Sequence, residues 1–162
     1  MSVALLSLGS NIEPERWLLA AAKALREQFP EIRFSPVLRY ASVGFQGPDF
    51  LNAAAMLETQ WEPQVLSDWL HEVEDAHGRQ RDVPKFSSRT LDIDLVFYGD
   101  RICTGPGTLR LPRAEIKHAF VLEPMAMLAP DFVDPLSGKA LATLWAEHPD
   151  QARPAPIVSL SV

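Results

Sequence analysis

The chain has 162 residues, of which 47% are hydrophobic and 22% are charged, which is the composition of one soluble globular domain. Its net charge of −6 at pH 7 excludes a general nucleic-acid surface, because such a surface needs a broad basic face. Its single cysteine, Cys103, excludes an internal disulfide and is typical of a reducing compartment.

The first half of the chain alternates apolar runs with breaks at proline and glycine. The apolar run at residues 3–8 has no basic region before it and is too short for a signal peptide or a membrane span. We therefore expect a cytoplasmic protein with no membrane partner. The pattern predicts, in order, a buried strand at 3–8, a helix at 14–29, a strand at 32–40, a loop at 42–49, a strand at 50–57 and a helix at 63–77.

The second half predicts a basic loop at 78–89, a strand at 91–97, a hairpin turn at 99–100, weak strands at 101–104 and 108–111, and helices at 120–128 and 140–147. We expect Pro124 to confine the regular part of its helix to the residues after it. Residues 1–148 are expected to form a single domain, and residues 149–162 a poorly ordered, proline-containing tail. The order β-α-β-β-α-β predicts an α+β fold, a ferredoxin-like α/β sandwich whose helices pack on one face of an antiparallel sheet.

Asp92 and Asp94 form the most informative pattern. Alternate side chains of a strand point the same way, so the two carboxylates would share a face, roughly 6–7 Å apart along the strand. The opposite face would be buried by Leu91, Ile93, Leu95 and Phe97. Two like charges this close repel each other unless a cation lies between them, and Mg²⁺ on a polyphosphate meets that need. A solvated strand edge would give the same spacing.

A basic segment just before this strand favours the metal–phosphate interpretation over the solvated edge. The chain has 15 Lys and Arg against 21 Asp and Glu, an overall acidic balance. A local cationic segment beside paired carboxylates is less often accidental in such a chain. Its basic residues are Arg79, Arg81, Lys85 and Arg89.

Five segments together resemble the 6-hydroxymethyl-7,8-dihydropterin pyrophosphokinase family, which moves a pyrophosphoryl group from ATP to a pterin alcohol in folate biosynthesis. The Arg-x-x-Asp-x-Asp core at 89–94 is the most specific, and the ordered set spans almost the whole chain. The segments are 8–11 (LGSN), 49–54 (DFLNAA), 78–81 (GRQR), 89–94 (RTLDID) and 120–125 (FVLEPM) with 129–130 (AP). The resemblance implies release of AMP and two Mg²⁺ ions as cofactors.

The resemblance also implies the roles of residues that contact ATP. Asp92 and Asp94 would bind the two metal ions, and Asp94 is the candidate to accept the proton of the pterin hydroxyl. A catalytic loop that closes over ATP would contain Arg79, Arg81, Lys85 and Arg89. Glu74 would lie close to the nucleotide. His118 stands where the family has an arginine, and Arg110 or Arg113 could compensate for the weaker imidazole.

The pterin site is implied by a second group of residues. Phe50 and Phe120 would sandwich the ring, although on sequence alone both read more often as core residues. Asn52 would bind the hydrogen-bonding edge of the ring, and a buried amide in a strand needs such a partner. The remaining contacts would come from Gly9 and Asn11 beneath the ring and from groups around Ser42, Val43 and Phe45.

Departures from the family pattern leave a second hypothesis open, a diverged paralogue that binds pterin or nucleotide with weak or altered transfer. Residues 40–44 (YASVG) lack the usual proline, and Ser87 replaces a glycine of the catalytic loop. A ferredoxin-like interaction or RNA-binding module is disfavoured, because a basic and aromatic sheet surface is missing. No feature demands a dimer, so we expect a monomer whose partners are ATP and a pterin.

Overall fold

The sheet is built around strand β1 (Ser2–Ser10), whose apolar sequence suits burial on both faces. The computed structural model describes residues 1–42, 44–78, 90–104 and 109–162. Strand β1 pairs antiparallel with β4 (Phe50–Thr59) and with β5 (Asp92–Tyr98). The strand order is β5-β1-β4-β3-β6, with β2 also beside β4, and every pairing is antiparallel. The ferredoxin-like order is therefore confirmed.

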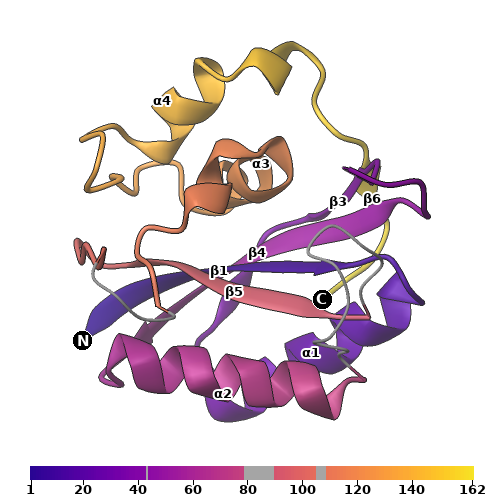
Figure 1. Ribbon diagram of the computed structural model, residues 1–162, viewed down its shortest axis with the longest axis horizontal. Helices are drawn as coiled ribbons and strands as arrows, with labels where there is room; N and C mark the ends of the chain where they lie inside the picture. Colours follow the sequence, from indigo (N-terminus) through magenta and orange to yellow (C-terminus); the bar gives the residue numbers. More distant parts are fainter. Residues whose placement is uncertain (43, 79–89, 105–108) are drawn as a thin grey trace.

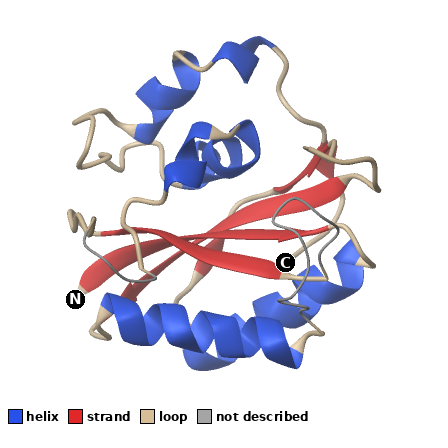
Figure 2. Ribbon diagram, in the orientation of Figure 1, coloured by secondary structure: helices blue, strands red, loops and turns tan. Residues whose placement is uncertain are grey.

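Helices cover both faces of this sheet, not one (Figures 1 and 2). Helices α1 (Pro14–Gln28) and α2 (Pro63–Ala76) lie on one face, and α3 (Ala119–Leu128) and α4 (Leu141–Ala146) lie on the other. Within β1, Leu6 and Leu8 belong to the first core and Leu5 to the second. The expectation of helices on one face was wrong. Strand β1 is apolar on both faces, and helices must pack against each face to shield it from water. None of the helices described is long and apolar enough to cross a membrane.

A β-bulge in β5 changes which side chains share a face. Leu95 is opposite Leu6, but Phe97 is opposite Leu5, so Val96 is an extra residue in the ladder. Leu91, Ile93 and Leu95 lie in the core under α1 and α2, as expected, whereas Phe97 lies in the core under α3. The alternation rule fails at Phe97 because the bulge rotates the end of the strand.

The segment expected as one strand at 32–40 is two strands, β2 (Arg33–Phe34) and β3 (Val37–Tyr40). The break falls at Ser35 and Pro36, where proline has no N–H for the ladder. The Ser35 hydroxyl compensates by accepting the N–H of Ala54 at 2.8 Å. The weak strands near residues 101–111 reduce to an isolated bridge between Cys103 and Leu111, and residues 105–108 lie outside the described part.

The C-terminal part differs most from expectation. Helix α3 begins at Ala119, five residues before Pro124, because the proline removes only one intrahelical donor and Val121 and Leu122 still donate to His118 O. The 3₁₀ helix η1 (Ala114–Lys117) precedes it. Residues expected as a poorly ordered tail contain the 3₁₀ helix η2 (Pro149–Ala152) and strand β6 (Ile157–Val158), which pairs with β3.

Candidate active site

A row of paired residues crosses the sheet on the face that α3 covers. Asp92 on β5 is opposite Gly9 on β1, Gly9 is opposite Asn52 on β4, and Asn52 is opposite Leu38 on β3. Residues directly opposite one another project from the same face, and strands lie about 4.8 Å apart. Asp92 and Asn52 therefore flank the glycine at a backbone separation of about 10 Å. The missing side chain at Gly9 lets the Asn52 amide lie over it, since an added Cβ would be 2.7 Å from Asn52 Nδ2.

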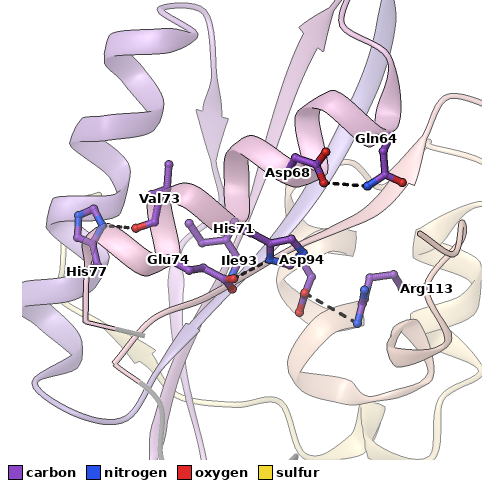
Figure 3. A network of polar contacts seen from close by, with 9 residues as sticks. All are labelled: Gln64, Asp68, His71, Val73, Glu74, His77, Ile93, Asp94 and Arg113. Atoms are coloured by element: carbon purple, nitrogen blue, oxygen red, sulfur yellow. Dashed lines mark hydrogen bonds and ion pairs between the residues drawn. The ribbon is translucent and has the colours of Figure 1, made fainter. Parts of the chain in front are cut away.

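Glu74 lies near Asp94 at the outer edge of β5 (Figure 3), and Asp92 is the third carboxylate of the group. Oxygen atoms of Glu74, Asp92 and Asp94 lie within 4.8 Å of one another. Glu74 comes from α2, and its side chain is only 1% exposed. Its Oε2 accepts the edge N–H of Ile93 at 2.7 Å, and its Oε1 lies 2.9 Å from Nδ1 of His71. We name Glu74, Asp92 and Asp94 the acidic cluster.

Helix α2 aims Glu74 at this edge because its buried face is fixed by apolar packing. Pro63 starts the helix at a position where its missing N–H costs nothing, and Leu66, Leu70 and Val73 enter the core. Glu74 follows Val73 directly and so projects past the core to the strand edge. The hydrogen bond from Ile93 N then orients the carboxylate, so one oxygen serves the edge of the sheet while the other faces His71.

Arg113 places a cation beside this cluster. Its Nη2 lies 3.8 Å from Asp94 Oδ1, and its Nε lies 3.2 Å from Glu115 Oε2. A backbone hydrogen bond from Arg113 N to Val96 O, 3.1 Å long, holds it beside β5. Both partners of the Asp94 ion pair are partly exposed, so the pair itself adds little stability. Its position in the site matters more than its contribution to folding.

The acidic cluster has the chemistry of a divalent-cation site. Three carboxylates in close proximity raise the local negative charge, and among the described residues Arg113 lies beside them, with its Nη2 3.8 Å from Asp94 Oδ1. Hard oxygen ligands with positions left for phosphate and water are the preferred surroundings of Mg²⁺. The donor set therefore fits magnesium, and Glu74 adds a third carboxylate to the pair that the sequence indicated.

Asn52 provides a buried polar group on the other side of Gly9. Its Nδ2 donates to Leu8 O at 3.4 Å, whereas its Oδ1 has no hydrogen-bond partner among the described residues. A buried acceptor without a partner costs about 1–3 kcal/mol, and a ligand N–H can recover that cost. The amide thus fits the edge of a heterocycle, with its Oδ1 as the acceptor.

The two aromatic residues expected at the pterin site, Phe50 and Phe120, are both half-buried. Phe50, two residues before Asn52 on the same face of β4, is half-buried and meets Phe45 edge-on at 6.4 Å between ring centroids. Phe120, at the start of α3, is also half-buried and is stacked on His118 at 4.9 Å. Neither ring is fully enclosed in a core, which favours the stacking interpretation.

The loop at residues 42–49 is tied to the first turn of the chain through one carbonyl. Pro48 O accepts from Asn11 Nδ2 at 3.1 Å and from Ser42 Oγ at 2.6 Å. Asn11 and Ser42 were both expected near the pterin ring. The shared acceptor brings the two residues to one end of the sheet, next to Phe50.

The structure places the predicted residues in two groups that share one face. Glu74, Asp92 and Asp94 meet at the edge of β5, and Gly9, Asn52 and Phe50 lie inward of them. His118 lies at the start of α3, where its ring stacks on Phe120. Arg110 is exposed, and its role stays a prediction. Predicted residues outside the described part of the chain are Val43, Arg79, Arg81, Lys85 and Arg89.

Sequence reasoning gives too little weight to three residues at the site. It offers Arg113 only as an alternative to Arg110 and assigns no role to His71 or Glu115. The available signal for His71 is its spacing, because residues three apart on a helix lie on one side and His71 therefore meets Glu74. No spacing rule indicates Arg113, which reaches Asp94 through the path of the chain after Pro112.

Comparisons with known proteins find similar proteins along most of this chain. A family model described as 7,8-dihydro-6-hydroxymethylpterin-pyrophosphokinase matches residues 5–130. A 2-amino-4-hydroxy-6-hydroxymethyldihydropteridine pyrophosphokinase of Synechocystis is 37% identical over 145 residues, which cover 87% of this chain and 73% of the relative. The enzyme of that name from Pseudomonas aeruginosa is 37% identical over 153 residues, covering 88% of this chain and 90% of the relative.

Among solved structures, the Plasmodium falciparum HPPK-DHPS wild type aligns with a TM-score of 0.70 at 10% identity. The alignment covers 90% of this chain but 44% of that protein, so the chain spans less than half of its length. At this identity the likeness concerns the fold alone. Because the family model matches most of the chain and relatives above one-third identity extend along it, the chain belongs to the 7,8-dihydro-6-hydroxymethylpterin-pyrophosphokinase family.

Proposed function

We propose that the chain transfers the pyrophosphoryl group of ATP to the hydroxymethyl group of 6-hydroxymethyl-7,8-dihydropterin, and that it does so beside the acidic cluster. The observation that carries this proposal is the row Asp92–Gly9–Asn52, which sets a metal-type carboxylate and a ring-binding amide on either side of a glycine. Family membership supports the reaction, and this row supports binding of its two substrates on either side of Gly9. We also propose that the enzyme acts as a cytoplasmic monomer.

Magnesium is the proposed cofactor, as two ions held by Asp92 and Asp94 with Glu74 beside them. When bound, the metal supplies positive charge to the phosphate oxygens of ATP, where negative charge concentrates during transfer. The carboxylate oxygens within 4.8 Å of one another support a shared metal site. Arg113, whose Nη2 lies 3.8 Å from Asp94 Oδ1, adds a cation that would attract the phosphate chain.

The protein's own groups position the acceptor alcohol. Asn52 would accept a ring N–H through Oδ1, and Phe50 and Phe120 would confine the ring between them. Transfer forms a bond between the hydroxymethyl oxygen and the β-phosphorus while the bond from that phosphorus to the AMP oxygen breaks. Asp94 is proposed to take the hydroxyl proton. Most of the rate acceleration would come from this positioning and from charge neutralisation.

Release of AMP tests the proposal directly. With ATP and Mg²⁺ the purified protein should release AMP only when 6-hydroxymethyl-7,8-dihydropterin is present, and EDTA should stop the reaction because the metal is removed. Chromatographic separation of AMP, ADP and phosphate measures the outcome. Pterin-dependent ADP, or no product from a folded protein that binds a Mg²⁺–ATP analogue, would contradict the proposal and favour a diverged paralogue.

Glu74→Gln should weaken metal binding without unfolding the chain. The amide oxygen can still accept the N–H of Ile93, but the charge that assists Mg²⁺ is lost. We expect the Mg²⁺ concentration for half-maximal rate to rise about tenfold, and the melting temperature to change by less than about 4 °C. Magnesium titrations of the rate and thermal melts measure both. If Glu74→Gln needs the same Mg²⁺ concentration as the parent for half-maximal rate, Glu74 does not contribute to the metal site.

A further inference from the structure

Tyr40 adjoins both aromatic residues proposed to hold the pterin ring. It is the last residue of β3 and is directly opposite Phe50 on β4, so the two side chains share the face that α3 covers. Its ring also meets the ring of Phe120 edge-on, at 6.5 Å between centroids and 71° between planes. Any displacement of Tyr40 would therefore change the space between Phe50 and Phe120.

A buried carboxylate fixes the hydroxyl end of Tyr40. Glu123, on α3 about one turn after Phe120, is 4% exposed, and its Oε1 accepts the Tyr40 hydroxyl proton at 2.5 Å. Burial raises the pKa of Tyr40 well above its usual value, and the hydrogen bond to Glu123 adds to this, so Tyr40 stays a donor. A charge-assisted hydrogen bond of this kind is short and directional. It joins the end of β3 to α3.

The same Glu123 oxygen also holds the C-terminal segment, which comprises residues 148–158. Ala155 N donates to Oε1 at 3.2 Å, and the next residue, Pro156, accepts the N–H of Arg39 at 3.1 Å. Strand β6 then pairs with β3. At its other end the segment is attached through His148 Nε2, 2.8 Å from Lys117 O. In Figure 1 it runs from beyond α4 down to the end of β3.

The backbone groups that hold the C-terminal segment are close in sequence to the aromatic residues of the proposed pterin site. Lys117 directly precedes His118 at the start of α3, and Arg39 directly precedes Tyr40. A buried carboxylate costs free energy unless it is hydrogen-bonded, and an apolar residue would fill the same space at lower cost. The directional link indicates that the orientation of Tyr40 and α3 matters beyond packing.

We propose that Tyr40 and Glu123 are positioning residues that set the distance between Phe50 and Phe120, and that the C-terminal segment acts through Glu123 to hold them. This inference rests on the proposed pterin site. It assigns a role to residues 148–158, which lie far from the acidic cluster in sequence, and it predicts an effect on pterin binding with no matching effect on ATP.

Four variants test the proposal. Tyr40→Phe keeps the ring but removes the donor, and Glu123→Leu removes the acceptor for both Tyr40 and Ala155. Each should raise KM for the pterin about tenfold while kcat and KM for ATP stay within about twofold. Ala155→Pro removes only one N–H donor and should raise the pterin KM about threefold. Glu123→Gln retains an acceptor oxygen and should remain within about twofold of the parent.

Asp134→Asn is the matched control. Asp134 is also buried, but the hydrogen bonds described for its carboxylate come from Leu136 N and the Ser137 hydroxyl, within its own turn. It should change thermal stability without changing the pterin KM. Lower melting temperatures in Tyr40→Phe and Glu123→Leu with an unchanged pterin KM would show that the Tyr40–Glu123 hydrogen bond only stabilises the fold. That result would overturn the proposal.

Amide hydrogen exchange separates this inference from the function on which it rests. In Glu123→Leu the N–H groups of Ala155 and Arg39 should exchange faster than in the parent, whether or not the chain is active. Ala155 N loses its acceptor, and Pro156 O, which accepts the N–H of Arg39, is then held less firmly. Unchanged exchange would overturn the role of the C-terminal segment. A parent protein that releases no AMP with the pterin would instead contradict the proposed function.

Discussion

Asp94→Asn is expected to lower kcat by at least about a thousandfold, with Asp92→Asn having a similar effect. Each change removes one negative charge from the acidic cluster, whose oxygens lie within 4.8 Å of one another, and so removes the main attraction for Mg²⁺. The fold should not suffer, since neutralising one of three close carboxylates relieves repulsion. Rates of AMP release at saturating ATP and magnesium, together with thermal melts without metal, measure the two effects.

Asp68→Asn supplies the control for this experiment. Asp68 is an exposed carboxylate on α2 that accepts a hydrogen bond from Gln64 Nε2 at 2.8 Å, and Figure 3 shows it apart from Glu74 and Asp94. It should leave the rate within about twofold, because surface charge changes of this kind have small effects. A second readout is the stabilisation of each protein by a Mg²⁺–ATP analogue, which should be lost in the Asp94 and Asp92 variants and kept in the control. If the Asp92 and Asp94 variants stay active, the assignment of the metal site to β5 is wrong.

Gly9→Ala should raise KM for the pterin by about a hundredfold or more. An added Cβ would lie 2.7 Å from Asn52 Nδ2, closer than real contacts allow, so the amide must move from the position in which it meets the ring. The forced shift should also cost about 1–3 kcal/mol of stability, as overpacking does elsewhere in cores. Steady-state kinetics with each substrate varied in turn should show the change in the pterin KM and little change in the KM for ATP.

A second substitution distinguishes the steric effect from a general loss of structure. Asn52→Ala in the Gly9→Ala background removes the clashing amide, and the melting temperature should recover toward that of Asn52→Ala alone. The pterin KM should stay high in both, because the Oδ1 acceptor is gone. Recovery of pterin binding in the double variant would contradict the role given to Asn52.

The order of elements and the chemistry of the acidic cluster could be predicted from sequence because both depend on local patterns. The apolar run of β1, prolines at the first positions of α1 and α2, and the period of two in Asp92 and Asp94 each act within a few residues. The expectation that Glu74 lies near the nucleotide followed from a resemblance to the family, and its contact with Ile93 N required the packing of α2 against β5.

What the sequence determined by itself was therefore the fold class and the residue types of a metal–phosphate site, since hydrophobic period and charge are properties of short segments. Only the tertiary structure decided that helices cover both faces, that the bulge at Val96 moves Phe97 to the α3 side, and that Arg113 reaches Asp94. It also decided that Glu123 joins Tyr40 to Ala155, two residues that are 115 positions apart in the chain. Such contacts follow from how strands and helices pack, and no local pattern specifies which distant backbone group a side chain will meet.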